Sequence, residues 1–151
     1  EALLVRNGRI LEGMTSNFFF ALGSRSERNE ARLLRRMKSK GASTTLRSAH
    51  EAPMHFRGRV IYTAQRDILL GVTRRTVIRV ARGSGFEVRY SLLKLDQLTA
   101  LSEAFITSSS RGIVPIIQID DVTVGQGRVG EVTKQLSAAY EAYVVQKAER
   151  I

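Results

Sequence analysis

The sequence has no cysteine and no long run of apolar residues. Without cysteine the chain can form neither a disulfide framework nor a thiolate zinc site, and it has no cysteine nucleophile. No apolar run approaches the roughly 18 residues that a membrane-spanning helix requires, and residues 1–6 have the pattern of a strand rather than of a signal peptide. We therefore expect a protein of a reducing compartment, with the cytoplasm as the default location and no membrane as a partner.

The remaining composition is that of an ordinary globular protein, apart from its charge. Apolar residues make up 43% and charged residues 25% of the 151 residues, enough for one domain with a sizeable core. The net charge is +10, and nine basic against three acidic residues between positions 23 and 58 supply most of it. A basic RNA- or DNA-binding module that uses residues 25–40 is therefore one alternative function.

The spacing of apolar residues predicts a mixed α/β fold. The Asn7-Gly8 pair between alternating segments predicts a type I′ hairpin, and residues 18–22 predict a strand buried on both faces. From residue 59 onward, strand and helix patterns alternate. Further strands are expected at 60–63, 86–90, 104–107, 113–119 and 122–124, with helices at 74–82 and 94–101 and a terminal helix whose apolar stripe runs from Val132 to Val144.

The segment 23–58 differs from the rest of the chain. Its composition changes abruptly to Arg, Ser, Lys and Glu, with little apolar surface to offset the entropy of ordering. We therefore expect a disordered or non-native insertion there. The single domain would then have a core made of residues 1–22 and 59–151.

Two motifs resemble a dinucleotide site and a metal site, but the residues around each motif argue against such a site. Residues 125–130 match the G-x-G-x-x-G pattern of dinucleotide sites, but a single helix follows, so no second strand completes the unit and a turn-forming loop is favoured. His50 and His55 lie five residues apart with Pro53 between them, which puts them off a common helical face. We expect no metal site, and without a G-x-S-x-G elbow we expect no hydrolase triad.

Two other segments have the residues of an anion site. In residues 71–76, Thr73 is expected to cap a helix whose first-turn N–H groups could hold phosphate oxygens, and the alternative is an ordinary capped helix. Residues 107–112 place four hydroxyl groups where a strand passes into a loop, and the alternative is a solvated polar loop. The residues alone leave these alternatives open.

Three blocks, in this order, resemble the C-terminal half of class IV pyridoxal-phosphate aminotransferases. They are Leu-Glu-Gly-Met-Thr-Ser-Asn-Phe at 11–18, Leu-Gly-Val-Thr-Arg-Arg at 70–75, and Glu-Ala-Phe-Ile-Thr-Ser-Ser-Ser-Arg-Gly-Ile-Val-Pro at 103–115. That family includes branched-chain and D-amino-acid aminotransferases and aminodeoxychorismate lyase. The resemblance covers residues 1–22 and about 60–148, and it implies the pseudo-barrel C-terminal domain of fold-type IV enzymes.

The resemblance also implies a site for pyridoxal 5′-phosphate. Glu12 would face the pyridine nitrogen, where a carboxylate keeps that nitrogen protonated. Val72 and Thr73 would bind the phosphate through backbone N–H groups, Thr73 also through its hydroxyl group. The remaining implied contacts are the hydroxyl of Ser109 at the phosphate, Leu70 near the ring, and Ser110 beside the substrate carboxylate.

The resemblance does not supply a complete enzyme. The family's cofactor-linking lysine, its smaller N-terminal domain and a phosphate-binding arginine lie upstream of the segment that matches Glu1, so we expect no catalytic residue in this chain and no activity of the chain alone. The intact parent would be a homodimer that transfers an amino group between a branched-chain or D-amino acid and a 2-oxo acid, without nucleic acid as a partner. An aminodeoxychorismate lyase-like enzyme and an inactive, partner-dependent fragment remain as alternatives.

Overall fold

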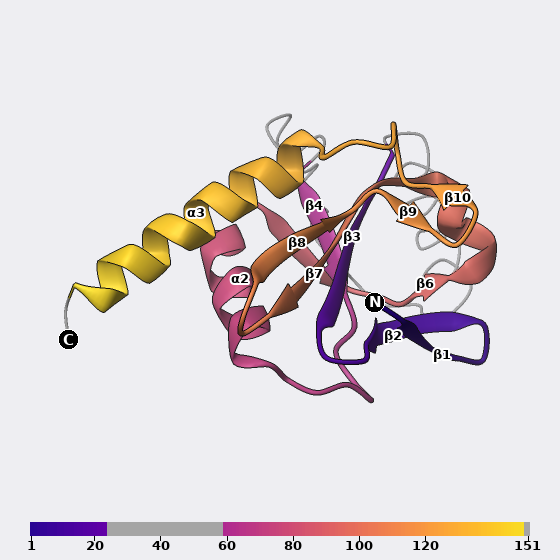
Figure 1. Ribbon diagram of the computed structural model, residues 1–151, viewed down its shortest axis with the longest axis horizontal. Helices are drawn as coiled ribbons and strands as arrows, with labels where there is room; N and C mark the ends of the chain where they lie inside the picture. The colour runs from indigo at the N-terminus through magenta and orange to yellow at the C-terminus, as the bar shows by residue number, and fades with distance from the viewer. Residues whose placement is uncertain (24–58, 150–151) are drawn as a thin grey trace, which may run out of the picture.

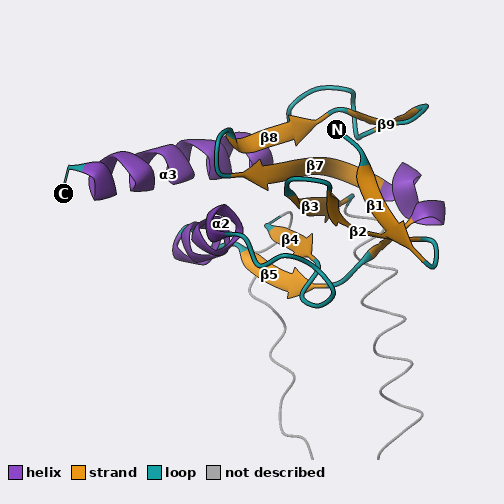
Figure 2. Ribbon diagram, turned by 60° about the horizontal axis from the view of Figure 1, so that its bottom comes forward, coloured by secondary structure: helices purple, strands orange, loops and turns teal. Residues whose placement is uncertain are grey.

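The computed structural model describes residues 1–23 and 59–149. These residues form a five-stranded sheet, a three-stranded sheet, a two-stranded ribbon and the helices α2 and α3 (Figures 1 and 2). The elements are β1 (Leu3–Arg6), β2 (Arg9–Gly13), β3 (Asn17–Leu22), β4 (Val60–Thr63), α2 (Val72–Gly83), β5 (Glu87–Tyr90), β6 (Leu93–Lys94), the 3-10 helix η2 (Leu95–Ala100), β7 (Leu101–Ser108), β8 (Gly112–Ile116), β9 (Gln118–Ile119), β10 (Val122–Thr123) and α3 (Glu131–Ala148). The predicted mixed α/β class is confirmed.

The structure describes almost none of the predicted insertion. The insertion predicted at 23–58, with the basic stretch 25–40 and both histidines, lies outside the described residues except for Gly23. Within the described ranges, neither helix is both long and apolar enough to cross a membrane.

The chain begins with the predicted hairpin. Strands β1 and β2 pair antiparallel, and the two turn residues between them have positive φ angles, 52° at Asn7 and 67° at Gly8. A type I′ turn requires a positive φ at both positions, which asparagine and glycine adopt at low cost. The hairpin prediction is therefore confirmed, and β6 extends this pair into the three-stranded sheet.

The five-stranded sheet has the strand order β5-β4-β3-β7-β8, so β3 lies at its centre. On one face Phe19 and Phe105 stack at 5.0 Å between ring centroids, and α2 and α3 cover them. On the other face Phe20 stacks on Tyr62 at 5.0 Å, under side chains from β2, β6 and η2. Strand β3 is consequently buried on both faces, as its apolar run predicts.

The predicted alternation of strands and helices is present along the chain, and one of its units is a parallel crossover. Strand β5 pairs parallel to β4 after the crossover through α2, whereas the other pairs of this sheet are antiparallel. Helix α2 packs through Val77, Ile78 and Ala81, the residues predicted from their spacing. It ends before Gly85, whose φ of 80° turns the chain toward β5.

Three details of the sequence prediction are wrong. Helix α2 begins at Val72, so Gly71 occupies the N-cap position and Thr73 is the second helical residue rather than the cap. The strand predicted at 113–119 is interrupted at Ile117, which is 49% exposed. The apolar stripe of α3 does not stay buried, because the helix runs past the sheet (Figure 1) and Val144 is 43% exposed.

Candidate functional site

A cavity of about 130 Å³ lies where the β2–β3 connection, the N-terminus of α2 and the β7–β8 turn meet. Its lining comes from three segments that are far apart in the sequence, namely Glu12, Gly13, Met14, Thr15, Ser16, Asn17, Leu69, Gly71, Thr73, Thr107, Ser108 and Ser109. The structure thus brings together Glu12, Thr73 and Ser109, which the resemblance assigns to one site. Leu70, Val72 and Ser110 are exposed and lie outside this lining.

Strand pairing explains why these segments converge. Asn17, the first residue of β3, is paired in register with Thr107 near the end of β7, so their side chains share one face of the sheet. This is the face that carries Phe19, Phe105 and helix α2. The N-terminus of α2 is joined to the same edge because the Asn17 carboxamide donates to the carbonyl of Leu69 at 2.6 Å.

Glu12 is half-buried in the lining of the cavity, and its carboxylate is held by two donors. The backbone N–H of Leu69 approaches its oxygens at 3.1 and 3.2 Å, and Asn17 Nδ2 donates to Oε2 at 3.0 Å. The cation Arg74 lies within electrostatic range of this carboxylate and is only 4% exposed. Burial lowers the pKa of Arg74, and attraction to Tyr90 and Glu12 offsets only part of this lowering.

The N-terminus of α2 supplies the opposite kind of group. The first hydrogen bond of the helix runs from the N–H of Arg75 to the carbonyl of Gly71 at 3.1 Å, so the N–H groups of Val72, Thr73 and Arg74 have no partner within the helix. No side chain caps this end, and the first turn contains no acidic residue. Such a helix terminus attracts anions through its free N–H groups and its dipole.

Hydroxyl groups next to this helix terminus have unused hydrogen-bonding capacity. Thr107 and Ser108 are 2% and 8% exposed, and their side-chain oxygens have no hydrogen-bond partner among the described residues. A buried polar group without a partner costs roughly 1–3 kcal/mol. Together with the uncapped helix, these groups fit an oxyanion such as a phosphate, while the Glu12 carboxylate of the same lining fits a cationic or N–H group.

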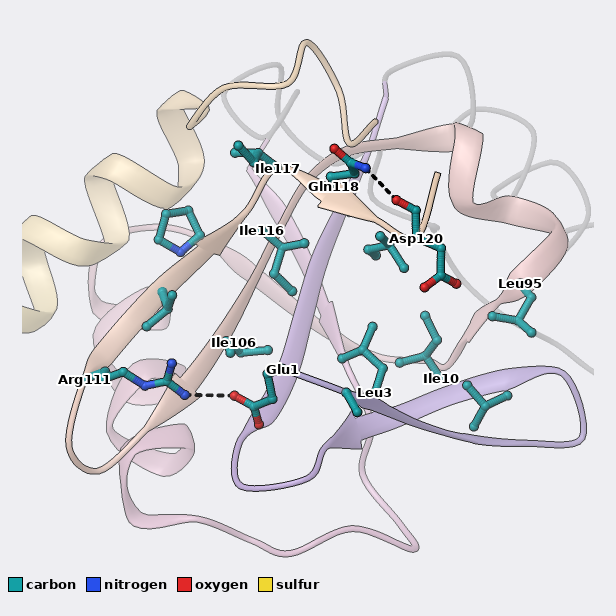
Figure 3. A pocket seen from close by; sticks show the side chains of 15 residues that line it. Glu1, Leu3, Ile10, Leu95, Ile106, Arg111, Ile116, Ile117, Gln118 and Asp120 are labelled. Atoms are coloured by element: carbon teal, nitrogen blue, oxygen red, sulfur yellow. Dashed lines mark hydrogen bonds and ion pairs between the residues drawn. The ribbon is translucent and has the colours of Figure 1, made fainter. Parts of the chain in front are cut away.

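A second, larger cavity of about 540 Å³ has a different chemical character. Apolar side chains including Leu3, Ile10 and Ile106 line most of it (Figure 3). At one end Arg111 pairs with Glu1 at 2.8 Å, so the charge of the arginine is already compensated. This cavity includes neither the N-terminus of α2 nor the unbonded hydroxyl groups of Thr107 and Ser108, and we therefore place the candidate site in the smaller, polar cavity.

Among the described residues, neither a lysine nor a metal-binding cluster belongs to the candidate site. Lys94, Lys134 and Lys147 are the lysines of the described ranges; they lie on β6 and α3, and none of them belongs to the lining of the candidate site. In the same part of the chain no group of three or more histidine, aspartate or glutamate side chains could hold a metal ion.

Sequence reasoning assigned no role to two groups that hold the site together. These are the carboxamide of Asn17 and the backbone N–H of Leu69, both bonded to Glu12. Asn17 belongs to the first block of the resemblance, but its partner Leu69 lies 52 residues away. No local sequence pattern indicates such a contact, so only the tertiary structure could identify it.

Comparison with known proteins gives consistent matches. The family described as "Amino-transferase class IV" matches residues 1–119. The branched-chain-amino-acid aminotransferase of Escherichia coli (strain K12) is 36% identical over 72 residues, which are 48% of this chain. The D-alanine aminotransferase of Bacillus licheniformis is 25% identical over 152 aligned positions, 99% of this chain.

A solved structure shows the same arrangement of elements. The branched-chain amino acid aminotransferase from Escherichia coli superposes with a TM-score of 0.65 and 26% identity over 93% of this chain. The matched part is 36% of the chain in that structure, and the sequence matches cover 23% of the E. coli protein and 41% of the B. licheniformis protein. The chain therefore spans less than half of the length of these relatives.

Proposed function

Because the chain belongs to the class IV aminotransferase family, we propose that it supplies part of a pyridoxal 5′-phosphate site. The complete enzyme would transfer an amino group between an amino acid and a 2-oxo acid. The observation that carries the proposal is the pairing of a held carboxylate, Glu12, with an uncapped helix N-terminus across one cavity. A pyridine nitrogen and a phosphate group are the two ends of this cofactor that would need such partners.

The cofactor, when bound, would supply a ring that accepts the electron pair released at the substrate's α-carbon. Glu12 would hold a proton on the pyridine nitrogen. Two unit charges about 4 Å apart at an effective dielectric constant near 20 interact by about 4 kcal/mol, which is enough to favour the protonated ring.

The phosphate end of the cofactor would be held chiefly by the backbone. The N–H groups of Val72 and Thr73 are free of helical partners, and the Thr73 and Ser109 side chains border the same cavity. Val72 needs only its N–H group for this role, which agrees with an exposed side chain. Leu70 would approach the ring, and Ser110 would border the substrate carboxylate.

The cavity is smaller than a complete cofactor pocket. Its volume of about 130 Å³ is below the roughly 300–1,000 Å³ of typical ligand pockets. We therefore propose that the described residues form one wall and that a lysine outside them makes the covalent link. Branched-chain and D-amino acids are the proposed donor classes, by analogy with the relatives, and a cytoplasmic homodimer is the proposed state of the intact enzyme.

The proposal is tested in a fusion of this chain with the N-terminal half of a class IV aminotransferase. Replacing Glu12 with glutamine is expected to lower turnover much more than cofactor affinity, because a neutral amide cannot keep the pyridine nitrogen protonated. The affinity should fall by no more than about a hundredfold, the effect of one hydrogen bond to a charged group. Normal turnover of the Glu12→Gln fusion at saturating cofactor would contradict the proposal.

A further inference from the structure

The side chain of Asn17 connects three parts of the candidate site. It is 4% exposed at the start of β3. Its Nδ2 group donates to Glu12 Oε2 at 3.0 Å and to the carbonyl of Leu69 at 2.6 Å. Its Oδ1 faces the start of α2, where a Cβ atom on Gly71 would approach it to 2.6 Å.

The chemistry of the neighbours fixes the orientation of this carboxamide. Nδ2 meets two acceptors, a carboxylate oxygen and a carbonyl oxygen, and an amide NH₂ group has two hydrogens to donate. Rotating the amide by 180° would place Oδ1 against both acceptors and would lose both bonds. Asn17 therefore has one favourable orientation, and in that orientation it restrains Glu12.

We propose that Asn17 is a positioning residue that holds the Glu12 carboxylate where it meets the ring nitrogen of the cofactor. This inference rests on the proposed function. Asn17 acts through two contacts, because it binds Glu12 directly and also binds the carbonyl of Leu69, whose N–H group is the other donor to Glu12. The Leu69 side chain is 77% exposed, so side-chain packing contributes little to holding that donor in place.

Loss of Asn17 would consequently weaken both restraints on Glu12. The carboxylate could then turn toward solvent, since Glu12 is only half-buried. At the phosphate end, the N–H groups belong to α2 itself, and Asn17 acts on them only indirectly, through its bond to the carbonyl of Leu69. Removing Asn17 should therefore weaken the contact with the ring nitrogen more than the phosphate contacts.

The test compares two ligands that differ only at that nitrogen: pyridoxamine 5′-phosphate and its analogue with a C–H group in place of the ring nitrogen. Calorimetry with the purified protein gives a dissociation constant for each. The unmodified protein is expected to prefer the natural ligand by about ten- to a hundredfold, the effect of one charge-assisted hydrogen bond. Glu12→Gln should remove most of this preference, and Asn17→Ala or Asn17→Leu should lower it by about tenfold.

A matched control removes a buried hydrogen bond elsewhere on the sheet. The hydroxyl of Thr63 donates to the carbonyl of Phe18 at 2.9 Å, outside the cavity. Thr63→Val should keep the ligand preference of the unmodified protein. If the Asn17 variants unfold, Gly71→Ala provides a second route, because its new Cβ displaces the same carboxamide without removing it and should lower the preference in the same way.

The outcomes separate the two levels of the proposal. A preference that is lost in Glu12→Gln but unchanged in folded variants of Asn17 and Gly71 would overturn the role of Asn17 and leave the cofactor site intact. A preference that is absent already in the unmodified protein would overturn the contact of Glu12 with the ring nitrogen, and the role of Asn17 with it. Equal losses of affinity for both ligands would reduce Asn17 to a structural residue.

Discussion

Replacing Glu103 with alanine is expected to destabilise the fold by about 2–3 kcal/mol. This carboxylate on β7 caps α3 from outside the helix, because it accepts the N–H groups of Val132 at 3.0 Å and Thr133 at 2.8 Å and the Thr133 hydroxyl at 2.7 Å. A hydrogen bond to a charged group contributes roughly 1.5–3 kcal/mol, and a carboxylate at a helix N-terminus adds about 0.3–1 kcal/mol. Since Glu103 is only half-buried, water would replace part of what is lost.

A second substitution tests the same contact independently. A Cβ atom on Gly130 would lie 2.1 Å from the Glu103 side chain, so Gly130→Ala should expel the carboxylate and destabilise the fold by a similar amount. In a Glu103→Ala background the obstructing side chain is absent, and Gly130→Ala should then cost little. The two substitutions are therefore expected to be strongly non-additive.

Urea unfolding of the four proteins in this cycle measures the coupling. For a chain of 151 residues, 2–3 kcal/mol corresponds to about 4–12 °C in the unfolding temperature. A loss below about 0.5 kcal/mol in Glu103→Ala would show that the carboxylate does not cap α3. Additive effects of the two substitutions would show that Gly130→Ala acts through some other contact.

Two further predictions concern acid stability and backbone strain. Burial raises the pKa of Glu1, but hydrogen bonds from Thr15, Ser16 and Arg111 outweigh it and lower that pKa from 4.5 to about 2. The stability that Glu1 contributes should thus be complete above about pH 4.5 and should disappear as the pH falls through about 2. Glu1→Gln should therefore lose less stability than the unmodified protein in that pH range. Identical acid unfolding profiles of the two proteins would contradict this. Gly125 has a φ of 57°, and a Cβ atom there would lie 2.1 Å from the carbonyl oxygen of Ser102. Gly125→Ala should therefore lower the free energy of unfolding, measured in urea, by at least about 1–2 kcal/mol. An unchanged midpoint of urea unfolding would refute the close contact.

Local elements were predictable because their determinants are neighbours in the sequence. Asn7 and Gly8 supply the positive φ angles of the first turn, and the spacing of Val77, Ile78 and Ala81 gives the buried face of α2. The start of α2 was not predictable in this way. A threonine within the first turn resembles a cap, yet Gly71 takes that position, where a side chain would collide with Asn17.

Elements whose ends depend on distant partners were also predicted poorly. The spacing of apolar residues in α3 indicates one continuous stripe, but burial decreases along it, from Leu136, which is fully buried, to Val144, which is 43% exposed. Periodicity reports which residues could be buried and contains no information on where the covering sheet ends. The residues of the candidate site were nominated by family resemblance, and their supporting contacts, such as Asn17 with Leu69, became visible only in the fold.

We expect the cavity between the β2–β3 connection, α2 and the β7–β8 turn to bind the cofactor with its phosphate at the helix. Titration of the purified protein with pyridoxamine 5′-phosphate, followed by ³¹P NMR, measures this binding. Thr73→Val should weaken binding by about ten- to a hundredfold, since it removes one hydrogen bond to a charged group, whereas Thr123→Val, at an exposed threonine of β10, should leave it unchanged. Equal affinities of the two variants, or no saturable binding to the unmodified protein, would contradict this expectation.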